Sequence, residues 1–165
     1  MKPLTIIIIL PSLAGGGAEK VILSLIENLN SVYFKPILIL QNRVGPLTTK
    51  IKSTSIINLK HKHFRSALPK LIKNIRIIKP DIIISTFPHI TLPLLIFRKY
   101  FYKGVRIIAR EPNMINSSLS NSPYPRILKY LHKKFMLKAD KIIVTSEKMK
   151  KDFIDRGIKE DKLFL

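Results

Sequence analysis

A short apolar run, a glycine bend and a helical pattern follow one another at the start of the chain. The apolar run Leu4 to Leu10 precedes Gly15-Gly16-Gly17, and a helical pattern extends from Ala18 to about Leu29. A buried strand, a turn and an amphipathic helix in this order form the first half of a βαβ unit. Free N–H groups and the positive dipole end at the start of such a helix suit a phosphate or another anion.

The glycine bend has two interpretations. It is a ligand loop, or it is a turn that only lets a strand reverse into a helix. The spacing does not match the dinucleotide motif, because Lys20 stands where the third glycine would be needed, and no P-loop sequence occurs in the chain. Three consecutive glycines exceed what a turn requires, so the sequence favours a ligand loop.

Strand and helix patterns alternate along the rest of the chain. Further strands are expected at 36–41, 55–59, 81–85, 105–109 and 141–145, and further helices at 64–78, 91–102, 123–138 and 147–156. This alternation without hairpin signals predicts an α/β fold, a Rossmann-like parallel sheet with helices on both faces. Ligands in such sheets bind at the carboxyl ends of strands, which selects the loops 13–17, 86–90, 110–116 and 146–147.

Helical spacing predicts which side chains are buried. In the first helix, Val21 and Leu25 belong to the expected buried face and Glu19 to the exposed one. His61, His63 and His132 lie in basic stretches and are expected to be solvated.

The charge of the chain is strongly positive. Thirty Lys and Arg residues oppose ten Asp and Glu residues, which gives a formal net charge of +20. Such a chain should be attracted to nucleic acid, anionic lipid or phosphate-bearing substrates, unless the excess is only compositional drift in a sequence rich in Ile, Lys and Asn. The chain has no cysteine, so thiolate metal sites are excluded, and no metal site is predicted.

The helix at 123–138 concentrates this charge. It carries Arg126, Lys129, Lys133 and Lys134 beside apolar side chains and contains no acidic residue. A basic amphipathic helix is typical of a protein that contacts a membrane surface or lipid phosphates, and the alternative is an ordinary helix with one solvated face. No stretch reaches the roughly 18 consecutive apolar residues of a spanning helix.

Two segments after strands carry reactive side chains. His89 follows the strand at 81–85, and a neutral imidazole there could accept a proton from a hydroxyl or orient a substrate. Arg110-Glu111-Pro112-Asn113 follows the strand at 105–109. Arg110 could bind a phosphate in a bidentate manner while Glu111 accepts from sugar hydroxyls, or the two could form an ion pair that only fixes the loop.

Three segments resemble family 4 glycosyltransferases: Gly15–Lys20 with the helix that follows, Arg110–Asn113, and Lys141–Glu147. The order Arg-Glu is reversed relative to the Glu-Arg of the family. The resemblance implies that 1–165 is the N-terminal, acceptor-side domain of a retaining enzyme, one half of a GT-B fold. It also implies that Gly15, Gly16 and Gly17 close over the donor phosphates, that His89 is catalytic, and that Arg110, Glu111 and Asn113 bind the acceptor.

The resemblance further implies a nucleotide-sugar donor as substrate, with no cofactor and no metal. The family's donor-binding C-terminal domain is absent from this sequence, so we expect a truncated product, an excised domain or half of a split transferase that pairs with a separate C-terminal half and is inactive alone. The expected acceptor is lipid-linked, a polysaccharide or a lipopolysaccharide, and the expected location is cytoplasmic, peripheral on the inner face of the cytoplasmic membrane. The alternative is a basic α/β nucleic-acid-binding module without enzymatic activity, which no nucleic-acid motif supports.

Overall fold

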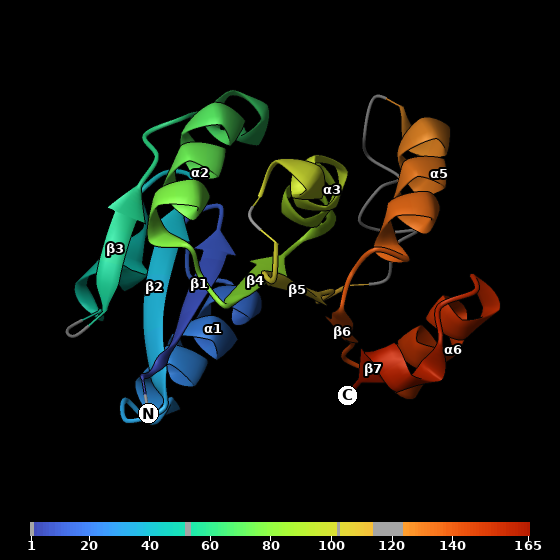
Figure 1. The fold of residues 1–165 in the computed structure, drawn as a ribbon, viewed down its shortest axis with the longest axis horizontal. Helices are drawn as coiled ribbons and strands as arrows, with labels where there is room; N and C mark the ends of the chain where they lie inside the picture. The colour runs from blue at the N-terminus through green and yellow to red at the C-terminus, as the bar shows by residue number, and fades with distance from the viewer. Residues whose placement is uncertain (1, 52–53, 102, 114–123) are drawn as a thin grey trace. The chain divides into compact units, whose positions relative to one another are not determined.

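The computed structural model describes residues 2–51, 54–101, 103–113 and 124–165, in which strands and helices alternate (Figure 1). The strands are β1 (Leu4–Leu10), β2 (Phe34–Leu40), β3 (Ser55–Asn58), β4 (Ile82–Thr86), β5 (Arg106–Arg110), β6 (Lys141–Ile143) and β7 (Leu163–Phe164). The helices are α1 (Gly17–Asn28), α2 (Phe64–Ile78), α3 (Pro88–Ile96), α5 (Pro125–Met136) and α6 (Glu147–Asp155). Single 3-10 turns are η1 (Pro46–Thr49), η2 (Phe97–Tyr100) and η3 (Glu160–Lys162).

The strands form one seven-stranded sheet in the order β3-β2-β1-β4-β5-β6-β7. The pairs β1·β2, β2·β3, β5·β6 and β6·β7 are parallel. Parallel neighbours joined through helices are the signature of a Rossmann-like α/β fold, so the predicted fold class is confirmed. By its internal contacts the chain divides into two compact units, and each is described by itself.

The first unit comprises Met1–Ile84 and Tyr100–Val105. Its centre is the pair β1·β2, which runs in register from Leu4 opposite Phe34 to Leu10 opposite Leu40. The apolar residues 6–10 and 37–40 are all buried, as expected for central parallel strands covered on both faces. Helix α2 has the predicted bounds, because Lys79 adopts a left-handed conformation with φ of 50° directly before Pro80.

Helix α1 buries a different face from the one that we predicted. Glu19 is buried, whereas Val21 and Leu25 are 50% and 38% exposed. The buried side chains are Glu19, Ile22, Leu23 and Ile26. These positions also recur at helical spacing, so a sequence with apolar residues on several sides of the helix did not determine which stripe faces the sheet.

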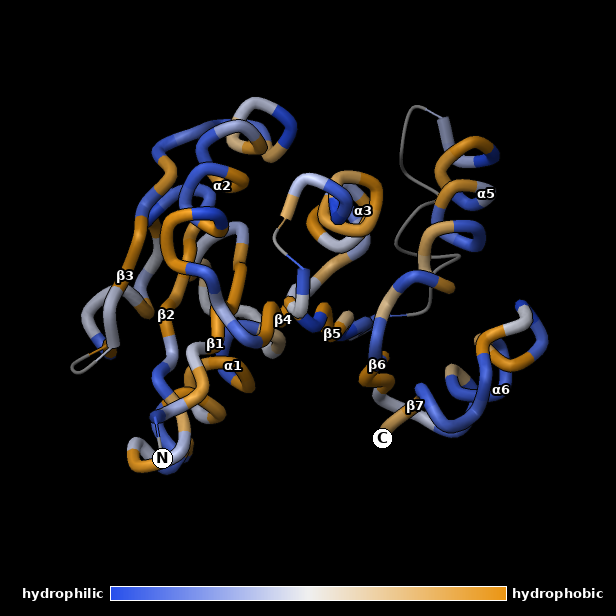
Figure 2. The backbone as a smooth tube through the Cα atoms, in the orientation of Figure 1, coloured by the Kyte–Doolittle hydropathy of each residue, from blue (hydrophilic) through white to orange (hydrophobic). Residues whose placement is uncertain are grey.

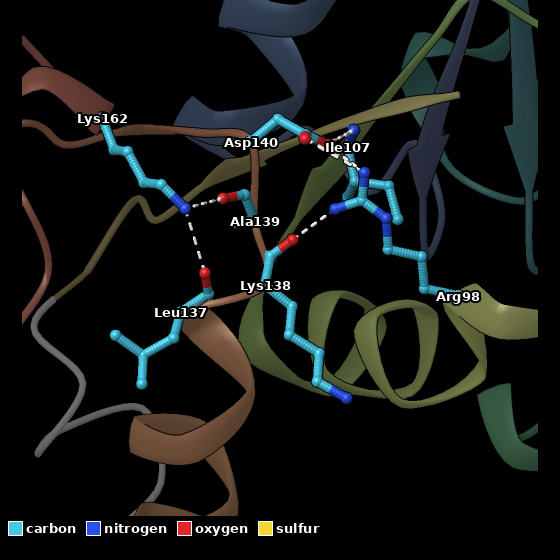
Figure 3. A network of polar contacts seen from close by, with 7 residues as sticks. All are labelled: Arg98, Ile107, Leu137, Lys138, Ala139, Asp140 and Lys162. Atoms are coloured by element: carbon cyan, nitrogen blue, oxygen red, sulfur yellow. Dashed lines mark hydrogen bonds and ion pairs between the residues drawn. The ribbon is translucent and has the colours of Figure 1, made fainter. Parts of the chain in front are cut away.

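The second unit comprises Ser85–Lys99 and Arg106–Leu165. Asp140 joins the start of β6 to β5: its backbone N–H donates to the Ile107 carbonyl (2.9 Å), and its Oδ2 accepts from the Ile107 N–H (2.7 Å). Arg98 forms an ion pair with the same carboxylate (2.8 Å) and donates to the Lys138 carbonyl (Figure 3). A charge-assisted network therefore fixes the segment between α5 and β6.

The residues at 162–164 continue this sheet. Leu163 and Phe164 pair with Ile142 and Ile143 of β6, and the Lys162 ammonium donates to the Leu137 and Ala139 carbonyls (both 3.0 Å; Figure 3).

The predicted boundaries around α3 and β5 also differ. Helix α3 begins at Pro88, which suits the first helical position, so the loop that we expected at 86–90 is reduced to a sharp turn at Phe87 with φ of 78°. Arg110 is the last residue of β5 and not the first of a loop. The remainder of the predicted loop at 110–116, residues 114–116, lies outside the described residues.

Candidate functional site

The glycine loop after β1 is shaped by a second glycine turn. The Leu13 N–H donates to the Val44 carbonyl (2.9 Å), and the Leu13 carbonyl accepts from Leu47 (3.3 Å). At Gly45, with φ of 114°, an added Cβ would lie 2.1 Å from the Leu13 carbonyl oxygen. Gly45 is therefore required by its conformation and by the close approach of the loop. The sequence signal was the Gly45-Pro46 pair, which indicated only a turn.

A carboxylate lies at the start of α1. Gly16 is the N-cap, and Glu19 is the third helical residue. A Cβ added at Gly16 would lie 2.5 Å from the Glu19 Oε2 atom, so this side chain folds back beside the N-cap. Acidic side chains are favoured there by the helix dipole. The position that we assigned to a donor phosphate is therefore next to a negative charge of the chain itself.

His89 lies in the first turn of α3. Its ring stacks on Phe87, with the ring centroids 5.8 Å apart and the planes 22° apart. More than a third of the residue is exposed, yet desolvation by the surrounding protein lowers the pKa of the imidazole. At neutral pH this ring is uncharged and can act as a hydrogen-bond acceptor or a base.

The tip of β5 carries Arg110, Glu111 and Asn113, and the three side chains face different surroundings. Asn113 is exposed. Arg110 is half-buried, and its Nη1 atom is buried without a hydrogen-bond partner among the residues that the structure describes. Burial lowers the pKa of Arg110, although an arginine remains charged at neutral pH. A buried donor without a partner is unusual in a protein and marks this position as a candidate anion contact.

Glu111 is buried completely and approaches a histidine. Its side chain is 0% exposed, and its Oε1 atom lies 3.6 Å from the Nε2 atom of His132, which is 1% exposed. The His132 ring lies against Phe153 of α6, with the ring centroids 6.2 Å apart. The prediction that His132 is solvated is wrong. The predicted alternative of an Arg110–Glu111 ion pair is not found within the described part of the chain, where the partner of Glu111 is His132.

Helix α5 presents cations and apolar side chains together on its exposed side. Arg126, Lys133 and Lys134 are exposed, and Lys129 is half-buried. Tyr124, Ile127 and Tyr130 are 58–68% exposed, and Figure 2 shows the alternation of polar and apolar residues along the helix. Apolar side chains of α5 are therefore partly exposed, and its buried positions are His132 and Met136.

The structure brings only some of the predicted site residues together. The three glycines belong to the first unit, and His89, the β5 tip and α5 belong to the second. Within the second unit, the Glu111–His132 contact joins the β5 tip to α5. Among the described residues, no group of three or more His, Cys, Asp or Glu side chains is placed to hold a metal ion, and none of the helices is both long and apolar enough to cross a bilayer.

Comparison with known proteins gives one family match and several structures of similar fold. The sequence model of Glycosyltransferase Family 4 matches residues 15–165. No curated protein matches the chain in sequence. Among solved structures, the lipopolysaccharide outer core galactosyltransferase WaaB in its apo form is similar, with a TM-score of 0.69, 18% identity, and coverage of 98% of this chain and 45% of WaaB.

Two further solved structures share the fold. HepE of Anabaena in complex with UDP and glucose has a TM-score of 0.68 and 13% identity, over 98% of this chain and 43% of HepE. A sucrose-phosphate synthase of Thermosynechococcus elongatus has a TM-score of 0.67 and 14% identity, over 95% of this chain and 46% of the synthase. The chain thus spans less than half the length of each of these structures.

Proposed function

Because this chain belongs to glycosyltransferase family 4, we propose that it forms the acceptor-binding half of a retaining glycosyltransferase. The enzyme would move a sugar from a nucleotide-sugar to a lipid-linked, polysaccharide or lipopolysaccharide acceptor. The observation that carries this proposal is the family match over residues 15–165. The complex of HepE with UDP and glucose supports a nucleotide-sugar donor, and the similarity to WaaB supports a cell-envelope glycan as acceptor.

The tip of β5 is the proposed acceptor contact. Arg110 offers a guanidinium with one donor that has no hydrogen-bond partner in the described part of the chain, and such a group suits a phosphate oxygen of a lipid-linked acceptor. The exposed amide of Asn113 can donate to or accept from sugar hydroxyls. Glu111, which the sequence also predicted as an acceptor contact, is left out of this proposal, because its carboxylate is 0% exposed.

His89 is the proposed catalytic group. Its imidazole is uncharged at neutral pH because desolvation lowers its pKa, so it can accept a proton from an attacking hydroxyl. The amides of Gly15, Gly16 and Gly17 are the proposed contacts of the donor phosphates. The nucleotide-sugar enters as a substrate, and the proposal includes no cofactor and no metal.

The proposed location is the cytoplasmic face of the cytoplasmic membrane, with the outer side of α5 on anionic lipid. Exposed Tyr and Ile side chains interspersed with Arg126, Lys133 and Lys134 suit an interface that is apolar on one side and negatively charged on the other. Each surface lysine near such a bilayer contributes about 1 kcal/mol. A shallow hollow at the start of the helix, lined by Tyr124, Pro125, Arg126 and Ile127, lies on the same side.

Acceptor binding is tested by titrating the chain with a soluble short-chain prenyl phosphate in a calorimeter. We expect Arg110→Ala to weaken binding by about tenfold or more, which corresponds to about 1.4 kcal/mol. Arg106→Ala is the matched control, because Arg106 is exposed at the opposite end of β5. Equal affinities for all three proteins would refute the assignment.

Residues 1–165 by themselves should bind the acceptor without turnover, because they span less than half of their structural relatives. Transfer of sugar from UDP-glucose or UDP-galactose by this chain alone would refute that part of the proposal.

Membrane binding is tested by sedimentation with vesicles. The chain should bind phosphatidylglycerol vesicles and not phosphatidylcholine vesicles, and Lys133→Gln with Lys134→Gln should reduce the affinity by about 20-fold or more. Lys148→Gln with Lys151→Gln on α6 is the control, since these two lysines are also exposed. Strong, salt-dependent binding to RNA that is lost with the α5 variants, without vesicle binding, would instead favour the nucleic-acid-binding module.

A further inference from the structure

The turn between β4 and α3 has a backbone conformation that a residue with a side chain rarely adopts. Phe87, the N-cap of α3, has φ of 78° and ψ of 140°. Glycine reaches positive φ without strain, whereas a bulky side chain makes the same conformation unfavourable. Glycine would therefore be the favoured residue if the turn only had to reverse the chain. The presence of phenylalanine at this position indicates a role for its ring.

Hydrogen bonds hold Phe87 in this conformation. Its carbonyl accepts from the N–H groups of Ile90 (3.1 Å) and Thr91 (3.0 Å) and from the Thr91 hydroxyl (3.0 Å). The Thr91 hydroxyl also lies 2.9 Å from that of Ser85 on β4, and both residues are 0% exposed. Because the single Thr91 hydroxyl proton goes to the Phe87 carbonyl, Ser85 is the donor to Thr91. Strained residues persist where several contacts fix them, and they concentrate at functional sites.

The ring of Phe87 lies against the ring of His89. The two ring centroids are 5.8 Å apart, and the planes differ by 22°, which is a stacked arrangement. Phe87 is only half-buried, so its ring is not an anchor in the fully buried core. A stacked apolar ring excludes water from one face of the imidazole and restricts its rotation.

Desolvation sets the protonation of His89. Burial is the cause that lowers its pKa. No other residue of α3 is titratable. Helix α5 packs against α3, and β5 is the neighbour of β4 in the sheet. The charged or titratable side chains on these neighbours and on η2 are Arg98, Lys99, Tyr100, Arg106, Arg110, Glu111, Arg126, Lys129, Tyr130, His132, Lys133 and Lys134. None of these charges is a cause of the shift, which agrees with an apolar cover on the imidazole.

We infer that Phe87 is a positioning residue whose ring holds the His89 imidazole in a fixed orientation and covers one of its faces. The hydrogen bonds through Thr91 and Ser85 keep the Phe87 backbone in the conformation that this contact needs. The inference rests on the proposed function for the role of His89 as a base. Phe87 touches neither substrate in this role and acts only through the imidazole.

The first test separates the backbone strain from the ring. Phe87→Gly and Phe87→Ala both remove the ring, but only glycine adopts φ of 78° without strain. We therefore expect Phe87→Gly to unfold at a higher urea concentration than Phe87→Ala. An alanine variant at least as stable as the glycine variant would show that the backbone is not strained, and would overturn the inference.

The second test follows His89 by NMR titration, with His89→Gln to assign its signal. In both variants without the ring, the midpoint of the His89 titration should move to higher pH, because water then reaches the uncovered face and stabilises the charged imidazole. The signal of His63, an exposed residue before α2, is the control and should follow the same curve in all proteins. A merely structural role of Phe87 would change stability alone, so an unchanged His89 midpoint in the folded variants would overturn the inference.

Ser85→Ala combined with Thr91→Val tests the same contact with Phe87 intact, and it replaces the Phe87 variants if they do not fold. It removes both hydroxyls, so that neither is left buried without a partner. We expect a weaker nuclear Overhauser effect between the two rings and a His89 midpoint at higher pH. An unchanged Overhauser effect with an unchanged midpoint would contradict the inference.

These titrations need neither a donor nor an acceptor, so they are independent of the proposed function. Sugar transfer that survives His89→Gln in a protein that contains this chain would refute the catalytic role of His89 and leave the positioning by Phe87 standing.

Discussion

The glycine loop of the first unit and the tip of β5 in the second unit are both strand ends with candidate functional groups, but they are shaped by different forces. In the glycine loop, backbone contacts set the geometry, and Gly45 is in direct contact with the Leu13 carbonyl. At the β5 tip, the buried Glu111–His132 pair sets it. We therefore expect the stability of the first region to depend on added side-chain atoms, and that of the second region to depend on pH and charge. Four predictions test this difference.

The largest effect is expected from Gly45→Ala. The new methyl group would lie 2.1 Å from the Leu13 oxygen in a residue with φ of 114°, so backbone strain and overpacking add together. We expect a loss of about 3–5 kcal/mol in the free energy of unfolding, independent of pH. Urea unfolding of the variant measures it, and a loss below about 1 kcal/mol would show that the two turns separate easily.

His132→Leu is the corresponding change at the β5 tip. It leaves Glu111 buried without a partner, which should cost about 2–3 kcal/mol at about pH 8. Because burial raises the pKa of Glu111 and His132 opposes the rise, the variant carboxyl should have a still higher pKa. The native variant then binds more protons than its unfolded state above the unfolded pKa, so its stability falls as pH rises through that window.

Urea unfolding of the wild type and of His132→Leu at about pH 5.5 and about pH 8 checks this sign. The destabilisation should be smaller by about 1 kcal/mol or more at the lower pH. If the loss is equal at both pH values, packing and not the carboxyl accounts for it.

Glu19→Gln tests whether a nearby side-chain charge affects anion binding at the glycine loop. Removal of the negative charge beside Gly16 should strengthen pyrophosphate binding by about fivefold, about 1 kcal/mol, and weaken α1 by about 0.5 kcal/mol. Calorimetric titration with pyrophosphate measures the affinity, and Glu27→Gln at the exposed end of α1 is the control. Unchanged affinity would mean that the phosphate does not bind at this helix start.

The smallest effect is expected from Gly17→Ala. A Cβ at Gly17 would meet no atom within 4 Å, and the residue is the first of α1. We expect the free energy of unfolding to change by at most about 0.5–1 kcal/mol, in the stabilising direction. A clear loss of pyrophosphate affinity at unchanged stability would show that the ligand approaches the backbone at this glycine.

The elements that the sequence predicted well are those with unambiguous local chemistry. The isoleucine-rich runs could only be buried strands, Pro80 limits α2, and the Ser146 hydroxyl accepts from the Met149 N–H at the start of α6, as its capping residue type predicts. By contrast, the face of α1 was mispredicted because apolar side chains occupy more than one of its sides.

The candidate site was less accessible from sequence because its contacts are between distant segments. His132 stands among lysines and was therefore expected in solvent, although its spacing of four from Met136 places both on one helical face. Its partner Glu111 lies 21 positions earlier in the sequence. The Gly45–Leu13 contact likewise requires the fold to be known, because a glycine next to a proline predicts only a turn.

Asp81 in the first unit joins the start of β4 to β1 by two hydrogen bonds, as Asp140 joins the start of β6 to β5. Its N–H donates to the Thr5 carbonyl (2.9 Å), and its Oδ2 accepts from the Thr5 N–H (2.7 Å). The two strands that Asp81 joins are nearly uniform in side chain, because 6–9 of β1 and 82–84 of β4 consist of isoleucine alone. If the register of such a strand shifted, almost the same apolar surface area would be buried. The hydrophobic effect therefore cannot distinguish the correct register from a shifted one. The two hydrogen bonds between Asp81 and Thr5 fix the alignment of β4 on β1, and loss of the carboxylate should yield misaligned but still compact chains.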